Sequence, residues 1–191
     1  MKKALILAIA MICTLTSCST YNNMVTLDEA TKTAWSNVET QYQRRADLIP
    51  NLVSTVKGYA THEESTLQAV IDARSKATSV NISMNDLSPE KIAEYQKAQS
   101  AVTSALGRLI AVSENYPDLK ANQNFLELQA QLEGTENRIT VARKDFNTAV
   151  QAYNTSVRVF PANIIAKMFD FEQKPYYEAD ESAAVAPKVE F

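Results

Sequence analysis

The sequence has 191 residues, of which 46% are hydrophobic, and its 19 basic and 22 acidic residues give a formal net charge of −3. A chain of this length forms one domain, and its acidic balance offers no basic patch to nucleic acid. The sequence contains three glycines, and the prolines at positions 50, 89, 117 and 161 stand between long uninterrupted segments. This punctuation is typical of long helices, so we expect an all-α fold.

Residues 1–17 have the pattern of a secretion signal. Two lysines precede an apolar run over residues 4–12, which is too short for a hydrocarbon core that needs roughly 20 residues. The segment ends in Leu-Thr-Ser before Cys18, and this ending resembles the lipobox of bacterial lipoproteins. We therefore predict a lipoprotein signal peptide at residues 1–17 and lipidation, including palmitate, at Cys18. The alternative is an ordinary signal peptide with Cys18 unmodified.

The mature chain is expected to be held to the membrane by its lipid. Removal of the signal leaves 17 basic against 22 acidic residues, a net charge of −5, so electrostatics would contribute little. Several acyl chains at one cysteine give stable anchoring. Residues 18–24 form a short linker that keeps the domain near the bilayer, and Ser19 favours the outer membrane, facing the periplasm. Cys13 leaves with the signal, so no disulfide is expected.

Residues 25–77 show one apolar helical stripe with a proline in it. Trp35, Val38, Tyr42, Ile49 and Val53 follow helical spacing. We expect two helices, 25–46 and 48–77, joined by a tight turn in which Asp47 caps the second helix and Pro50 lies in its first turn.

The alternative for this region is a single Pro-kinked helix over residues 25–77. Such a helix would be about 80 Å long, whereas the next predicted helix is about 42 Å. The surplus would leave Leu27, Trp35 and Val38 exposed, so the hairpin is preferred and the kinked rod is the form that a dimer would use.

Two further long helices are predicted from seven-residue repeats. Ser88 and Pro89 give a start signal for residues 89–116, and Pro117 and Asp118 precede a helix over residues 119–157. The inward positions are Ile92, Tyr95, Gln99, Val102, Leu106, Leu109, Ser113 and Tyr116, then Phe125, Leu128, Leu132, Thr135, Ile139, Ala142, Phe146, Ala149 and Tyr153. This periodicity predicts left-handed coiled-coil packing in an antiparallel four-helix bundle over residues 25–169.

The bundle is followed by a short C-terminal helix and an extended tail. Residues 162–169, ANIIAKMF, place Ile164, Ile165, Met168 and Phe169 where they could cap the core or, less favourably, touch lipid. Residues 170–191 are expected either to pack along a groove, through Tyr176, Tyr177, Val189 and Phe191, or to remain free as a peptide ligand.

Three separated motifs resemble one known family. The run QYQRRADLIPNLVSTVKGYA, the later LEGTENRI and the ending APKVEF are similar to the LemA family. The resemblance covers the chain from about residue 21 to its end. It implies a membrane-attached helical bundle with no agreed substrate, and membrane protease complexes as partners.

Arg44 and Arg45 form the first candidate site, together with Asp47, Pro50 and Asn51. Arg45 continues the apolar stripe, and the hairpin would place it at the membrane-distal end, level with Asp118. The structural interpretation is that Arg45 binds loop carbonyls and Asp47 or Asp118. The functional interpretation is a docking site for a partner's carboxylate.

The second candidate is a polar layer in the middle of the bundle. Gly134 costs about 1 kcal/mol inside a helix, which suggests a packing or functional role. Counting along the helices places Gln99 level with Thr135, and Glu136 or Asn137 would add hydrogen bonds. The motif ends at Arg138. Such a layer usually fixes helix register, and a ligand pocket beside Gly134 is the alternative.

No catalytic set emerges from the sequence. His62 is the only histidine, which excludes dinuclear carboxylate sites with two Glu-x-x-His motifs and zinc sites built from His and Cys. We expect neither a cofactor nor a metal. The leading hypothesis is a lipid-anchored, non-enzymatic scaffold or adaptor of the cell envelope, with an envelope protein or a second copy as partner. The alternative is a bundle that binds a small molecule or lipid in a cavity of about 300 Å³ or more.

Overall fold

The computed structural model describes residues 2–80, 82 and 87–178, with side chains from residue 18 onward. The described part of the chain is helical and contains no strand, which confirms the all-α bundle. The helices are α1 (Lys2–Lys57), α2 (Glu64–Ser79), α3 (Pro89–Ser113), α4 (Pro117–Lys120), α5 (Gln123–Arg158) and α6 (Ala162–Met168).

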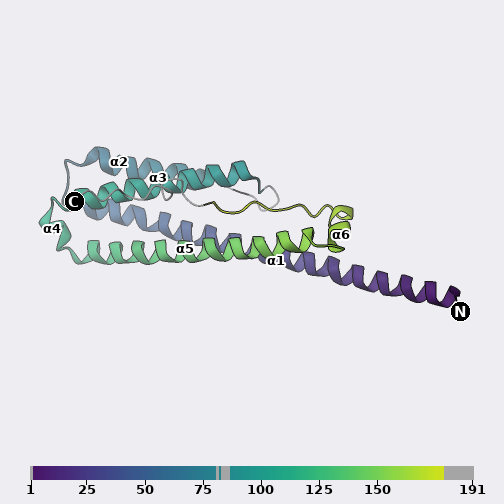
Figure 1. Cartoon of the computed structure of the whole chain (residues 1–191). Helices are drawn as coiled ribbons and strands as arrows, with labels where there is room; N and C mark the ends of the chain where they lie inside the picture. The colour runs from purple at the N-terminus through teal and green to yellow at the C-terminus, as the bar shows by residue number, and fades with distance from the viewer. Residues whose placement is uncertain (1, 81, 83–86, 179–191) are drawn as a thin grey trace, which may run out of the picture.

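The four longer helices pack as two antiparallel pairs (Figure 1). α5 runs back along α1, and the hairpin of α2 and α3 lies against the C-terminal half of α1. The N-terminal end of α1 extends beyond the bundle, past α6. None of the helices in the described part of the chain combines the length and hydropathy needed to cross a bilayer.

The expected turn at residues 46–49 is wrong. α1 continues without interruption through Pro50 to Lys57, and the chain reverses over residues 58–63 instead. The kinked-helix alternative is therefore nearer to the structure, although α1 ends well before residue 77.

The comparison of helix lengths was wrong because it set α1 against α3, whereas the long partner of α1 is α5. α5 has 36 residues, about 54 Å, and packs along α1, so residues of α1 that the length comparison left exposed have partners. The ring of Trp35 lies 5.2 Å from that of Phe146 on α5 and 5.5 Å from that of Tyr95 on α3. Leu27 packs at the end of the bundle against the buried cluster of Met24, Tyr153, Val157 and Ala166.

The helix tolerates Pro50 because another side chain replaces the lost hydrogen bond. Proline has no amide hydrogen, so the carbonyl of Ala46 has no partner at position 50. Arg74 on α2 donates from Nε to the oxygen of Ala46 over 2.7 Å. The buried carbonyl is thereby satisfied, and α1 need not break.

The predicted heptads of α3 and α5 form the core. Most of their inward positions are buried, including Ile92, Gln99, Leu109, Phe125, Thr135 and Phe146. Ser88 caps α3 by accepting from the amide of Lys91. α5 begins later than expected, because Pro117–Lys120 forms a separate turn and Asn122 caps the long helix.

α6 packs against the end of the bundle, and Ala166 is its one buried residue. Ala166 is buried against α1 and α5, whereas Ile164, Met168 and Phe169 are each more than half exposed. The expectation that these three residues cap the core is wrong. Ile164 and Met168 are two positions from buried Ala166 and so lie on the opposite side of the helix, and Phe169 follows the end of α6.

Beyond α6 the chain runs back along the bundle as an extended segment up to residue 178 (Figure 1). Tyr177 is buried and Tyr176 is exposed. Val189 and Phe191 lie outside the described residues.

Candidate functional site

Arg45 lies at the centre of a buried polar layer. From α1 its guanidinium donates to the carbonyl oxygen of Gln99 (3.0 Å) and to Gln99 Oε1 (2.6 Å) on α3. It also donates to Thr103 Oγ1 (2.9 Å) and to Glu136 Oε1 on α5 (2.7 Å). The Arg45 side chain is 2% exposed and that of Glu136 is 42% exposed. Arg45 therefore ties three helices together from inside the bundle.

This position corrects the expected surroundings of Arg45. Because α1 continues past Pro50, Arg45 faces the middle of α3 and α5 and not the distal loop near Asp118. Asp47 points to solvent and accepts a hydrogen bond from Gln43 Nε2 (2.8 Å). Neither aspartate is the partner of Arg45.

The structure brings the two candidate motifs together. Gln99 and Thr135 are both buried, and Arg45 bridges Gln99 to Glu136, the neighbour of Thr135. Thr135 Oγ1 donates to the carbonyl of Gln131 (2.7 Å) and accepts from Arg138 Nη2 (3.1 Å). The sequence expected a polar layer here but did not link it to Arg45.

The remaining residues of the two motifs face solvent. Arg44, Pro50, Asn51 and Asn137 are exposed. A Cβ placed on Gly134 would meet only the Arg138 guanidinium, at 3.6 and 3.8 Å, which is ordinary contact distance. Close packing therefore does not require glycine at this position.

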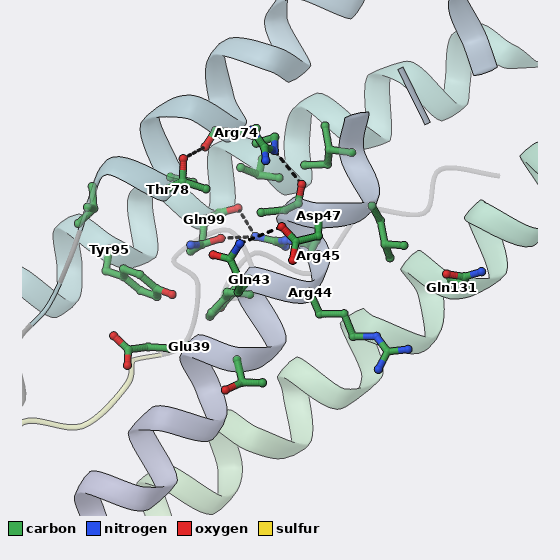
Figure 2. A pocket seen from close by; sticks show the side chains of 18 of the residues that line it. Glu39, Gln43, Arg44, Arg45, Asp47, Arg74, Thr78, Tyr95, Gln99 and Gln131 are labelled. Carbon is green, nitrogen blue, oxygen red and sulfur yellow. Dashed lines mark hydrogen bonds between the residues drawn. The ribbon is translucent and has the colours of Figure 1, made fainter. Parts of the chain in front are cut away.

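A polar groove of about 720 Å³ opens beside the layer (Figure 2). It is lined mainly by α1, α2 and α3, with one residue from α5. Its walls include Glu39, Gln43, Arg44, Arg45, Asp47, Arg74, Thr78, Tyr95, Gln99 and, from α5, Gln131. Burial raises the pKa of Glu39 above its ordinary value. Burial also raises the pKa of Tyr95 and Tyr42 above that of an ordinary phenol.

A second arrangement, absent from the sequence analysis, holds the tail. Asn147 and Asn154 on α5 each bond to both the amide and the carbonyl of one tail residue, Tyr177 and Lys174 respectively. The sequence carries a pattern that could have indicated this arrangement. The two asparagines are seven residues apart, and each directly follows an aromatic residue that faces the core.

Lys174 also links the tail to α1. Its ammonium lies 2.8 Å from Asp28, which Lys32 contacts at the same distance. Burial raises the pKa of Asp28, but the hydrogen bonds from Lys174 and Lys32 outweigh it and hold the pKa below its ordinary value.

Cys18 lies at the opposite end from the α1–α2 turn. Its side chain is exposed, and Tyr21, one helical turn later, contacts Phe169 and Phe171 at ring distances of 4.8 and 5.5 Å. Large apolar side chains are exposed at this end, and we call them the apolar end patch: Tyr21, Val25, Val159, Phe160, Ile164, Met168 and Phe169.

Metal chemistry finds no support among the described residues. They contain no group of three or more His, Cys, Asp or Glu side chains that could hold a metal ion. His62 is exposed in the turn between α1 and α2.

Comparison with known families decides the relationship. The LemA family model matches residues 34–191. This range includes the Arg45 layer and the two asparagines, Asn147 and Asn154, that bind the tail. The chain belongs to the LemA family. The match begins after Cys18, so the N-terminal segment must be judged from its own residues.

Curated relatives of this LemA-family chain carry two kinds of name. Magnetosome protein MamQ 2 of Paramagnetospirillum magneticum is 27% identical over 191 residues, covering 88% of this chain and 70% of that protein. MamQ of Magnetospirillum gryphiswaldense is 26% identical with the same coverage. Protein LemA of Metamycoplasma hominis is 26% identical over 148 residues, covering 78% of this chain and 64% of that protein.

Proposed function

We propose that this LemA-family chain is a lipid-anchored, non-enzymatic scaffold or adaptor of the bacterial cell envelope. The observation that carries the proposal is the position of Cys18. It ends a signal-like sequence, its side chain is exposed, and it lies one helical turn before Tyr21, which belongs to the apolar end patch. A lipid at Cys18 would bring that patch to the bilayer.

The apolar end patch supports the same orientation. Phe160 is 80% exposed, and Ile164, Met168 and Phe169 are also largely exposed. Apolar and aromatic side chains of this kind settle at the boundary between headgroups and acyl chains. A lipidated bundle would therefore stand on its α6 end, with the α1–α2 turn away from the membrane.

Metabolic labelling with an alkyne fatty acid tests the anchor. Wild type should carry the label and stay in the membrane fraction through repeated washing, whereas Cys18→Ser should lose the label and wash off, because the apolar end patch alone binds weakly. Cys13→Ser is the matched control, because that cysteine lies in the proposed signal and should leave labelling unchanged. Labelling of Cys18→Ser at the wild-type level would reject lipidation at this residue.

The adaptor part of the proposal rests on how the polar residues are used. The Arg45 guanidinium makes its hydrogen bonds to side-chain and main-chain groups inside the bundle. This supports a structural role for Arg45 and not a catalytic one. Three of the relatives are named as magnetosome proteins, so we propose that this chain also serves an assembly. Resemblance to the family adds a membrane protease complex as the partner, and we place the chain on the outer membrane, facing the periplasm.

Photo-crosslinking in cells tests for the partner. Arg45 and Tyr177 are buried, so photoreactive residues belong at their exposed neighbours Arg44 and Tyr176. Reproducible capture of one envelope protein supports the adaptor. Capture of only a second copy of this chain would replace it by a homo-oligomeric scaffold.

The polar groove favours a second function, binding of a small molecule. Its volume of about 720 Å³ lies in the range of ligand sites, and its charged walls suit a polar compound better than an acyl chain. Native mass spectrometry of protein purified from its own cells would reveal a bound ligand. A ligand lost on Gln43→Leu but kept on exposed Gln68→Leu would support this function.

A further inference from the structure

The extended segment beside α5 is held chiefly through its main chain. Asn154 donates from Nδ2 to the carbonyl of Lys174 and accepts its amide at Oδ1, both at 2.8 Å. Asn147 makes the same pair of hydrogen bonds with Tyr177, again both at 2.8 Å. Each asparagine thus imitates a neighbouring β-strand, and the two together form what we call the asparagine clamp.

The spacing of the clamp matches an extended peptide. Seven residues along α5 correspond to about 10.5 Å. Three residues of extended chain, from Lys174 to Tyr177, cover about 10 Å. The two asparagines therefore meet the amide and carbonyl groups of residues 174 and 177 in register. Because the bonded groups are main-chain atoms, the clamp accepts many sequences of an extended segment.

One side chain supplies selectivity. Tyr177 is 5% exposed, and its hydroxyl lies 2.6 Å from that of Tyr42. The Arg143 guanidinium stacks 4.1 Å from the centre of the Tyr177 ring. Gln96 and Arg143 both donate to the carbonyl of Glu178, at 3.1 and 3.2 Å. A tyrosine between two helices is thus recognised by ring and hydroxyl together.

The space between α3 and α5 that holds Tyr177 continues as a groove beyond the described tail residues. A groove of about 450 Å³ is bounded by Tyr177 and Glu178 and extends between α3 and α5 toward the Arg45 layer. Its walls are mostly polar, with Gln96, Lys97, Ser100, Thr103, Glu136 and Thr140 among them. The groove therefore has room for a longer peptide than residues 174–178.

We propose that this α3–α5 groove is a peptide-binding site for an extended, tyrosine-containing segment of a partner protein, which enters by displacing residues 174–178. The inference deepens the adaptor part of the proposed function and rests on it, whereas the lipid anchor does not enter the argument. The chain's own KPYYE segment shows the chemistry of the ligand. It is also an intramolecular competitor at high effective concentration, so release of the tail regulates the site.

Peptide binding to the full chain tests the proposal. The probe is a fluorescent peptide EQKPYYEA, identical to residues 172–179, and the readout is fluorescence anisotropy. Tyr177→Pro removes the amide donor and the phenol of the resident tail and changes no residue of α3 or α5 that lines the groove. We expect saturable binding to this variant, at least tenfold tighter than to wild type. The peptide EQKPYPEA should not bind.

A second substitution tests whether the peptide binds at the asparagine clamp. In the Tyr177→Pro chain, Asn147→Leu should weaken peptide binding at least tenfold, whereas Thr148→Ala, at the exposed next position, should not. Circular dichroism establishes that each variant is folded.

Two results would overturn the proposal. The first is no binding to folded Tyr177→Pro, or binding that Asn147→Leu leaves unchanged. The second is a wild-type dimer in light scattering that Tyr177→Pro dissociates, because the occupant would then be the tail of a second copy. Loss of membrane attachment in Cys18→Ser changes neither result, so failure of the anchor and failure of the groove are distinguishable.

Discussion

Arg74 on α2 donates a hydrogen bond to the main-chain oxygen of Ala46 on α1, 2.7 Å away. This carbonyl is the one that Pro50, four residues later, leaves without an intrahelical donor. The contact therefore does two things at once. It allows a 56-residue helix to continue through a proline, and it fixes α2 against α1.

The Arg74 contact predicts a specific coupling between two residues. Arg74→Met should lower the free energy of unfolding by about 1–3 kcal/mol, because it leaves a buried carbonyl unsatisfied. Pro50→Ala alone should stabilise the chain, since alanine restores the amide donor and removes the proline penalty of up to about 3 kcal/mol. Urea unfolding of the single variants measures both effects.

The double variant decides whether the mechanism is correct. In Pro50→Ala the carbonyl of Ala46 has a donor within its own helix, so Arg74→Met should cost markedly less there. An equal cost in both backgrounds would show that Arg74 stabilises α2 in some other way.

The sequence predicted the helical content but not where α1 ends. The apolar stripe runs at one phase through Pro50, and this favoured the continuous helix that the structure shows. The hairpin was preferred because a continuous helix would be about 80 Å long against about 42 Å for the helix predicted over residues 89–116, and its surplus would be exposed. Nothing in the local sequence indicates that a side chain 28 residues away supplies the missing donor. That information is tertiary.

The candidate residues were predicted better than their partners. The helical repeats correctly placed Gln99 and Thr135 inside the bundle. The wrong turn shifted Arg45 to the end of the molecule, so its contact with Glu136 could not be foreseen. The asparagine clamp was missed because its partner is an extended segment without periodicity, whose position depends on where α6 directs the chain.

The Arg45 layer predicts a large and asymmetric loss of stability. Arg45→Ala should cost about 2–5 kcal/mol, because it empties the space of a large side chain that is 2% exposed and leaves Gln99 Oε1 without its donor. Glu136→Gln should cost less, since the amide oxygen can still accept and the site is open to water on that side. Denaturant unfolding measures both, and an unchanged midpoint for Arg45→Ala would instead support the docking interpretation.

Gly134 offers a test of the packing interpretation. Gly134→Ala should stabilise the chain by about 0.5–1 kcal/mol, because it removes the helix penalty of glycine and its Cβ would meet only a flexible arginine at ordinary distance. Thermal unfolding provides the measurement. Gly107→Ala, whose Cβ would have no neighbour within 4 Å, should show a similar gain. A clear destabilisation at Gly134 alone would restore a packing role.

Asp28 predicts how the tail attachment depends on pH. Its pKa is lower in the folded chain than its ordinary value of 3.8, since burial is outweighed by Lys174 and Lys32. A depressed carboxyl pKa stabilises the fold above the unfolded-state pKa, and this contribution is lost as pH falls through the folded-state pKa. Wild type should therefore lose more stability below about pH 4 than Asp28→Asn does. Thermal melts between pH 6 and pH 3 test this, and parallel pH profiles for the two chains would contradict it.

The apolar end patch predicts weak membrane binding that does not depend on the lipid. Phe160 and Met168 are 80% and 67% exposed, so replacing both with serine in a Cys18→Ser chain should leave the unfolding free energy nearly unchanged. The same double substitution should weaken binding to phosphatidylcholine vesicles at least tenfold, since transfer of one large apolar side chain from water contributes about 1.5–3 kcal/mol. Vesicle co-sedimentation provides the measurement. Val141→Ser is the matched control, because Val141 is 58% exposed but lies midway along α5, away from α6. Equal losses for both substitutions would mean that vesicle binding is not oriented and that the α6 end has no special relation to the membrane.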